Sequence, residues 1–307
     1  MSCCPPSAPG RNSPSHTPAS EMHGGVTREW ANVPAGDYLL GTHDPDANPG
    51  DGEGPPRMVR LGEFAIAATT VTNGEFAEFV AATKYRTEAE QLGWSFVFHD
   101  LVSPKMAARV RRRSAEVPWW HMVEGACWRW PGGRGSHIAG KEDHPVVHVS
   151  WNDAIAYCAW SGTRLPTEAE WEASARGGLI GARFPWGDDL LSGGNHMCNI
   201  WQGDFPNHDD AEDGFHGTCP VRSFPPNGFG LYEVAGNVWE WTSDWWTTGL
   251  PDSLGADSHG KAAKVMRGGS FLCHESYCNR YRVAGRTSNT PDSASSNIGF
   301  RVAQDPD

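Results

Sequence analysis

The sequence predicts one loop-rich α+β domain whose core is built on aromatic side chains. Its 307 residues include 15 Trp, each of which can bury a large surface from a single position. They also include 36 Gly and 23 Pro, which break the backbone into short elements and turns. Helical and strand periodicity is confined to short stretches and largely disappears after residue 180.

Four short stretches indicate strands. Residues 33–42 (VPAGDYLLGT) have a turn followed by strand-forming residues, and residues 58–67 (MVRLGEFAIA) form a second candidate. Late in the chain, residues 264–272 (KVMRGGSFL) and 298–303 (IGFRVA) are short and β-like. We expect these pieces, separated by turns, to supply the β-structure.

The first clear helix is predicted directly after Thr72. Thr72 and Glu75 have the spacing of a capping box, in which two side chains satisfy backbone N–H groups at the helix start. Phe76, Phe79 and Val80 then fall on one helical face. The pattern predicts an amphipathic helix with this face in the core.

Two further helices follow in the middle of the chain. One should begin near Asn152 or Asp153 and carry Ile155 and Cys158. The other is predicted from an N-cap at Thr167 to a stop at the glycine pair 177–178.

The chain divides into a tail and one domain. Residues 1–27 are rich in Pro, Ser and Gly and have no apolar period, which predicts a disordered tail. Cys3 and Cys4 lie in this tail and are interpreted as bystanders. Because no Pro- or Ser-rich linker interrupts the remainder, we expect a single domain over residues 28–305.

The net charge of −12 argues against nucleic acid as a partner, because phosphate binding needs a basic surface. The basic run of Arg109 and residues 111–113 is interpreted as a solvated helix face. No stretch approaches the roughly 20 apolar residues of a membrane span, and the first 20 residues lack the apolar core of a secretory signal. We expect a cytoplasmic monomer, unless a leader was removed before this numbering begins.

Four cysteines are scattered singly, without the paired spacing of zinc sites, and are interpreted as buried, inert thiols: Cys127, Cys158, Cys198 and Cys219. Cys273 and Cys278 differ, because five residues leave them about 140° apart on a helix and on opposite faces of a strand. Their sulfurs can meet only if the chain turns between them, and Gly268 and Gly269 just upstream permit unusual backbone angles. The spacing leaves three possibilities open: unremarkable thiols, a redox disulfide, or a soft metal such as Cu(I).

The segment around this pair, residues 267–282 (RGGSFLCHESYCNRYR), closely resembles the active-site segment of formylglycine-generating enzymes, the sulfatase-modifying factors. The paired cysteines after RGGS are the specific part of the resemblance, which extends over about residues 28–305. Further similar blocks are residues 143–160, 164–172, 184–188, 199–206, 225–246 and 289–301.

The resemblance implies a mixed α/β fold with little regular secondary structure, related to C-type lectin domains. It implies an oxidase that uses molecular oxygen and one Cu(I), held by Cys273 and Cys278. The substrate would be an unfolded or nascent sulfatase, in which the cysteine of a Cys-x-Pro-x-Arg motif becomes Cα-formylglycine.

The resemblance also assigns supporting roles to four other residues. Ser270 and Trp239 match residues near the copper and the oxygen pocket. Arg286 and Asn297 match polar residues near the substrate groove.

The acidic segment 208–215 (HDDAEDGF) lacks EF-hand spacing and, by itself, indicates a surface turn. The resemblance instead implies two Ca²⁺ sites made of side-chain and backbone oxygens. The first would use Asn199, the Ile200 carbonyl, Asp213 and the Phe215 carbonyl. The second would use Glu233, the carbonyls of Gly236 and Val238, and Glu240.

One departure from the family bears on the compartment. Secretory members carry structural disulfides at positions that match Cys158, Ala175, Val283 and Val302 here. Those bridges cannot form in this chain, which fits a reducing compartment.

Two other functions remain as alternatives. Iron-dependent sulfoxide synthases contain related domains but need an additional helical domain with iron-binding histidines. A lectin-like binding module would keep the fold without the copper site. His144 and His148 could bind a metal, but a structural role is the commoner use of such residues.

Overall fold

The computed structural model describes Pro5 and residues 27–110, 112–248 and 262–306. Its helices are short and lie mostly in the first 180 residues, as the sequence predicted. They are α1 (Asn73–Thr83), α2 (Glu88–Leu92), α3 (Pro104–Ala107), α4 (Trp151–Ser161) and α5 (Glu168–Arg176), with 3₁₀ turns η1 (Pro49–Asp51) and η2 (His99–Leu101). None of these helices is long and apolar enough to span a bilayer.

The strands form several small sheets. A four-stranded sheet in the order β14-β13-β12-β15 occupies the centre, and β15 runs parallel to β12 while the other pairs are antiparallel. Its strands are β12 (Trp239–Trp245), β13 (Lys264–Arg267), β14 (Arg286–Asn289) and β15 (Ile298–Phe300).

The remaining strands build the edges of the molecule. They are β1 (Trp30–Val33), β4 (Phe64–Ala67) and β16 (Ala303–Gln304) in one sheet, and β5 (Trp94–Phe98), β7 (Trp120–Glu124) and β6 (Arg112–Arg113) in another. Two-stranded ladders join β2 (Gly36–Leu40) to β3 (Arg57–Leu61), β8 (Leu191–Ser192) to β9 (Asn195–His196), and β10 (Gly203–Asp204) to β11 (His208–Asp209).

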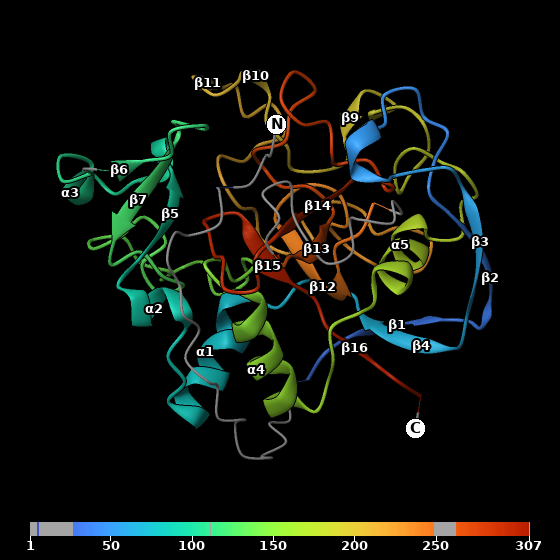
Figure 1. Ribbon diagram of the computed structural model, residues 1–307, viewed down its shortest axis with the longest axis horizontal. Coiled ribbons are helices and arrows are strands. Elements are labelled where there is room, and N and C mark those ends of the chain that lie inside the picture. Colours follow the sequence, from blue (N-terminus) through green and yellow to red (C-terminus); the bar gives the residue numbers. More distant parts are fainter. Residues whose placement is uncertain (1–4, 6–26, 111, 249–261, 307) are drawn as a thin grey trace.

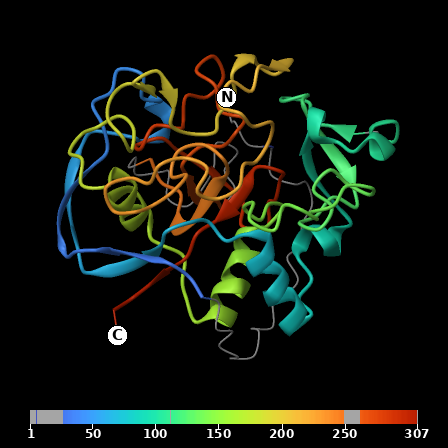
Figure 2. The same ribbon diagram turned by 180° about the vertical axis from the view of Figure 1, so that it is seen from behind.

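Two flanks enclose the central sheet. Figure 1 shows β5–β7 with α2 and α3 on one side and α5 with the β2–β3 hairpin on the other. Helices α1 and α4 pack against each other below the sheet, and Figure 2 shows the same arrangement from behind. The long loops of the second half of the chain cross the top of this frame.

The helix ends follow the predicted caps. Thr72 and Thr167 each accept the N3 backbone N–H in a complete capping box, and α5 ends at Gly177 in a left-handed conformation. Helix α4 begins one or two residues earlier than predicted, because Ser150 is its N-cap and Asp153 completes the box. A cap at Ser150 places the short side chain of Ala154, and not Ile155, in the core.

Two sequence predictions need correction. Residues 58–67 are not one strand: the chain breaks at Gly62, so that β3 pairs with β2 while β4 joins β1 and β16. The alternating exposure of β3 and the complete burial of β4 explain why the two halves enter different sheets. In the basic run, Arg112 and Arg113 are exposed as predicted but belong to β6, and not to a helix. The predicted tail, apart from Pro5 and Thr27, lies outside the described residues.

Buried ion pairs add to the contacts of the central sheet and join it to α5. Arg301 forms two hydrogen bonds with Glu240 at 2.7 and 2.8 Å, and Arg267 reaches Glu172 at 2.7 Å. The four side chains are almost completely buried. Because removing one partner would leave an uncompensated buried charge, such pairs fix which segments lie together.

The two candidate histidines have structural contacts. His148 is fully buried, with Nδ1 2.9 Å from Ser95 Oγ and Nε2 2.8 Å from the Pro131 carbonyl. His144 Nδ1 lies 2.9 Å from Thr218 Oγ1. Burial lowers the pKa of His148 to about 4, because the charged imidazolium is poorly solvated there.

His148 should therefore make the fold acid-sensitive. His148 takes up a proton near pH 6.5 in the unfolded chain but only near pH 4 in the native chain. The free energy of unfolding therefore falls as the pH drops from about 6.5 to about 4. The loss should approach about 3 kcal/mol from this group. Urea unfolding at several pH values should show a smaller acid loss in His148→Asn and an unchanged loss in the exposed control His216→Gln. Equal acid sensitivity in all three proteins would contradict this assignment.

Candidate active site

Cys273 and Cys278 lie on a tight turn over residues 270–282, called the cysteine turn below. The backbone N–H of Cys273 donates to the Ser270 carbonyl at 2.8 Å, and that of Cys278 donates to the His274 carbonyl at 2.9 Å. Both cysteines are buried in one core cluster. The chain thus turns between them, which the spacing requires if the sulfurs are to act together.

Gly268 and Gly269 make this turn possible. Both have positive φ angles, 94° and 76°, which residues with a side chain rarely adopt. A Cβ atom on Gly269 would lie only 3.0 Å from the Cα atom of Tyr281, so the end of the cysteine turn packs directly on the glycine backbone. The glycine pair is therefore a geometric requirement of the site.

A chain of polar contacts leads from Cys273 into the core. The backbone N–H of Ser270 donates to Cys273 Sγ at 3.3 Å. The Ser270 hydroxyl oxygen accepts a hydrogen bond from Asn297 Nδ2 at 2.9 Å, and Ser295 Oγ donates to Asn297 Oδ1 at 2.7 Å. All of these groups are buried, so Asn297 fixes the hydroxyl of the residue whose backbone N–H contacts the Cys273 sulfur.

Trp239 belongs to the same cluster as the two cysteines. It begins β12, and its backbone N–H donates to the Asn297 carbonyl at 2.9 Å. Its side chain is fully buried, and its Nε1 has no hydrogen-bond partner among the described residues. A buried indole N–H without a protein partner is a donor that a small molecule in the interior could use.

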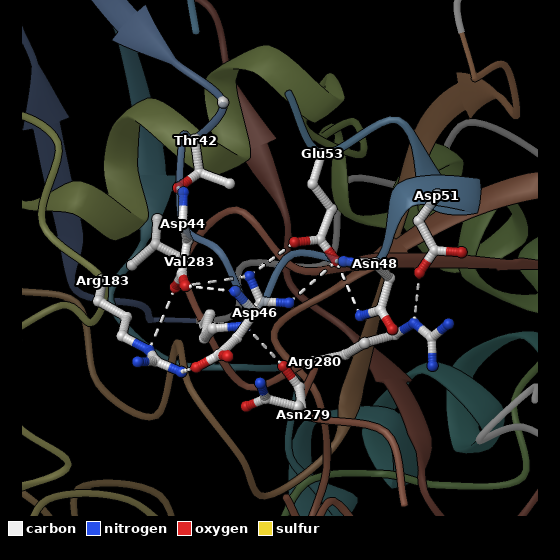
Figure 3. Close-up of polar contacts among 12 residues, drawn as sticks. Thr42, Asp44, Asp46, Asn48, Asp51, Glu53, Arg183, Asn279, Arg280 and Val283 are labelled. Carbon is white, nitrogen blue, oxygen red and sulfur yellow. Dashed lines mark hydrogen bonds and ion pairs between the residues drawn. The ribbon is translucent and has the colours of Figure 1, made fainter. Parts of the chain in front are cut away.

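Carboxylates of residues 44–53 hold the far end of the cysteine turn. Glu53 accepts two hydrogen bonds from Arg282, at 2.6 and 3.0 Å, and two from Asn48. Asp51 accepts from Arg280 Nε at 2.6 Å. Figure 3 shows Asp51 facing Arg280 of the cysteine turn, and Asn48 next to Glu53 in the same loop. The sequence analysis missed these residues, because nothing in a Gly- and Pro-rich loop indicates a partner 229 residues away.

An acidic cavity of about 600 Å³ opens beside the cysteine turn. Its walls include Glu275, Ser276, Asn279 and Tyr281 of the turn, and carboxylates from elsewhere in the chain: Asp46, Asp188 and Asp189. The excess of carboxylates over the single Arg183 favours a cationic group near the cysteines.

Arg286, which was also expected near the substrate groove, has a different position from Asn297. Its guanidinium forms two hydrogen bonds with Glu168, at 2.6 and 2.7 Å, and also donates to the carbonyls of Asp51 and Thr247. The residue is 6% exposed. In this structure Arg286 fixes the loops around the site, while Asn297 touches Ser270 directly.

Of the four groups predicted for the first calcium site, the Asp213 carboxylate and the Ile200 carbonyl lie together, whereas the Asn199 amide donates to the Gly217 carbonyl. Asp213 accepts hydrogen bonds from the backbone N–H groups of Ile200 and Phe215, at 3.1 and 2.9 Å. Gln202 Nε2 donates to both Asp213 Oδ2 and the Ile200 carbonyl, so these two oxygens face one point. The partners are neutral, and burial raises the pKa of Asp213. A divalent cation at this point would remove that penalty, and the oxygen donors suit Ca²⁺.

The residues of the second predicted calcium site are engaged with protein groups. Both carboxylate oxygens of Glu240 pair with Arg301, and Trp171 Nε1 also donates to Glu240 at 2.6 Å. Glu233 accepts from the backbone N–H groups of Arg222 and Phe224. Glu240 already has a cationic partner, so it fits a metal ion less well than Asp213 does.

The four scattered cysteines are buried and form no disulfide, as expected. Burial raises the pKa of Cys158 and of Cys219 to about 12 and also raises the pKa of Cys127 and of Cys198. Val302 lies in the same core cluster as Cys158. An apolar side chain thus stands at one of the positions where secretory members are expected to have a cysteine.

The comparisons agree with this geometry. Residues 17–306 match the model of the FGE-sulfatase family, described as a sulfatase-modifying factor enzyme 1-like domain. A formylglycine-generating enzyme of Thermomonospora curvata is 57% identical over 293 residues, covering 92% of this chain and 95% of the relative. A Bos taurus protein named inactive C-alpha-formylglycine-generating enzyme 2 is 50% identical over 286 residues, covering 92% and 90%.

A solved structure has the same fold. PvdO from Pseudomonas aeruginosa aligns with a TM-score of 0.65 and 27% identity, covering 95% of this chain and all of that one. The fold and the two-cysteine site define a loop-rich α+β domain with a buried thiol pair. The chain belongs to the FGE-sulfatase family.

The four scattered cysteines should resist alkylation in the native protein. Alkylating reagents attack the thiolate, which a raised pKa makes scarce. Iodoacetamide at about pH 8, below the ordinary thiol pKa, should leave Cys127, Cys158, Cys198 and Cys219 unmodified until denaturant is added. Peptide mass mapping reads out each site. Rapid native labelling of Cys158, or a stable bridge from it to another of the four, would refute the assignment.

Proposed function

We propose that this chain is a formylglycine-generating enzyme that activates sulfatases by oxidising one of their cysteines to Cα-formylglycine. The proposal includes the finer details: a Cys-x-Pro-x-Arg motif in an unfolded polypeptide as substrate, molecular oxygen as oxidant and Cu(I) as cofactor. The observation that carries it is the pair of buried cysteines on one turn, beside Ser270. One relative, which is 50% identical, is named inactive. The proposal therefore rests on the cysteine site in addition to family membership.

The cysteine turn fits Cu(I) by the chemistry of its donors. Two thiolates on a rigid turn suit a soft ion of low coordination number. No group of three or more His, Cys, Asp or Glu side chains that could hold a metal ion occurs among the described residues, so a harder ion has little to bind there. Cys273 and Cys278 would hold Cu(I), which supplies a centre where a substrate thiolate and oxygen can react.

The surrounding residues prepare the site for a thiol substrate. Asn297 fixes the Ser270 hydroxyl, which can orient the incoming cysteine. Trp239 is fully buried in the same core cluster as the two cysteines. The carboxylates of the acidic cavity favour approach of a peptide that carries an arginine.

The two cysteines should be equally necessary for copper binding. Serine offers a harder and mostly protonated oxygen, which is a poor ligand for a soft d¹⁰ ion. We expect Cys273→Ser and Cys278→Ser each to abolish tight Cu(I) binding and conversion of a Cys-x-Pro-x-Arg peptide while the fold stays intact. Competition with a Cu(I) chelator and mass spectrometry of the peptide under air are the measurements.

Ser270→Ala serves as the matched comparison. It should retain copper but slow turnover by about 10-fold or more, because a positioning hydroxyl is lost and no ligand is. Full copper-dependent activity in Cys278→Ser would exclude the two-thiolate site. Absence of aldehyde on every such peptide, with copper-loaded protein in air, would favour the lectin-like binding module.

We also propose that the first calcium site binds Ca²⁺ through Asp213 and the Ile200 carbonyl, with Asn199 and the Phe215 carbonyl nearby. At a free Ca²⁺ concentration 100 times the dissociation constant, binding would stabilise the native state by about 2.7 kcal/mol. Chelator should therefore lower the melting temperature of the wild type, and Asp213→Asn should remove most of that effect. The exposed neighbour Glu212→Gln is the control. An identical melting curve with and without chelator, in protein that contains no calcium, would exclude the site.

A further inference from the structure

Tyr281 lies between the cysteine pair and the acidic cavity. The residue is 4% exposed and belongs to the same core cluster as Cys273 and Cys278. It also lines the cavity of about 600 Å³, together with Glu275 and Asn279 of the cysteine turn. Tyr281 therefore has one side toward the two cysteines and another toward the opening through which a ligand can approach them.

The position of Tyr281 is fixed before any ligand binds. Its ring stacks on that of Phe184, with the centroids 5.9 Å apart and an angle of 6° between the planes, and Phe184 stacks on Trp186 in the same way. On the backbone side, a Cβ atom on Gly269 would lie within 3.1 Å of both the Cα and the Cβ atom of Tyr281. A side chain that is held from both sides loses little entropy when it binds a ligand.

The Tyr281 hydroxyl forms no hydrogen bond with any residue that the structure describes. Buried phenols usually find a partner. Tyr157, for example, accepts a hydrogen bond from Arg28 at 2.9 Å. Tyr85 donates to Asp153 at 3.0 Å. The Tyr281 hydroxyl is not one of the fully buried polar atoms without a partner, so it keeps contact with solvent at the cavity wall.

The surroundings of this hydroxyl are rich in sulfur. Burial raises the pKa of Tyr281, and four acidic groups nearby raise it further: Cys198, Cys273, Glu275 and Cys278. The hydroxyl therefore stays protonated and can act as a hydrogen-bond donor. None of these four groups accepts its hydrogen bond in the structure, so the donor is available to a group that enters beside them.

A thiolate that enters here needs such a donor, because Glu275 and the other carboxylates of the cavity disfavour a further negative charge. Hydrogen bonds to an ionised acceptor are roughly twice as strong as those between neutral groups. We propose that the Tyr281 hydroxyl donates a hydrogen bond to the thiolate of the substrate cysteine, which makes Tyr281 a catalytic residue; this rests on the proposed function. Ser270 and Tyr281 then hold the substrate sulfur from the beginning and the end of the cysteine turn.

Tyr281→Phe removes the hydroxyl and keeps the ring that stacks on Phe184. We expect kcat/KM for a Cys-x-Pro-x-Arg peptide to fall by about 10- to 100-fold, the effect of one hydrogen bond to a charged group. The Cu(I) affinity, measured by competition with a chelator, and the melting temperature should stay unchanged. The matched control Tyr38→Phe removes a hydroxyl that donates to the Pro34 carbonyl far from the site and should leave kcat/KM unchanged.

A binding experiment tests whether the hydroxyl touches the substrate sulfur. Two labelled peptides are compared by fluorescence anisotropy in the absence of oxygen, on protein supplied with Cu(I). One peptide carries the motif, and the other has alanine in place of its cysteine. Tyr281→Phe should weaken binding of the cysteine peptide by about 5-fold or more and that of the alanine peptide by less than about 2-fold. A purely structural effect would weaken both equally.

The binding result does not depend on turnover. If no aldehyde forms but Tyr281→Phe selectively weakens the cysteine peptide, the proposed function fails and the contact with the thiolate stands. Equal loss for both peptides, no loss for either, or no binding of either to the wild type would overturn the proposal. A lower Cu(I) affinity in Tyr281→Phe would also overturn it, because the hydroxyl would then act on the cysteine pair and not on the substrate.

Discussion

The buried ion pair between Arg282 and Glu53 is the constraint on which the site depends. It joins the cysteine turn to a loop 229 residues earlier in the chain, and Asn48 adds two more hydrogen bonds to the same carboxylate. In a fold with short strands and long loops, no ladder of backbone hydrogen bonds could hold the turn in place. Breaking such a pair by removing one partner typically costs about 3–5 kcal/mol, which is enough to release a loop.

The same principle operates throughout the molecule. Arg301, directly after β15, pairs with Glu240 of β12 inside the central sheet. Arg267 of β13 pairs with Glu172 and so connects that sheet to α5. The apolar interior then closes over these pairs with aromatic side chains such as Trp239. The result is a stiff frame that can hold two cysteines on a turn without a disulfide or an extended sheet. This rigidity suits a site that must bind a soft ion and a flexible peptide together.

The sequence predicted the features that depend on local chemistry. The capping boxes at Thr72 and Thr167 each involve residues within one helical turn, so the sequence alone is enough to recognise them. The spacing of Cys273 and Cys278 showed that their sulfurs can meet only if the chain turns between them, and the adjacent glycine pair permits such a turn. The partners of Arg282 could not be predicted, because a pairing across most of the chain leaves no periodic pattern. The split of residues 58–67 was missed for a related reason, since only the sheet partners distinguish its halves.

Amide hydrogen exchange tests the central claim most directly. If the ion pair holds the site, amides of residues 270–282 in the wild type should exchange as slowly as those of the central sheet. Glu53→Gln should accelerate their exchange selectively, whereas Asp37→Asn, which removes an exposed ion pair with Arg60, should not. Fast exchange of the turn in the wild type, or unchanged protection in Glu53→Gln, would contradict the account.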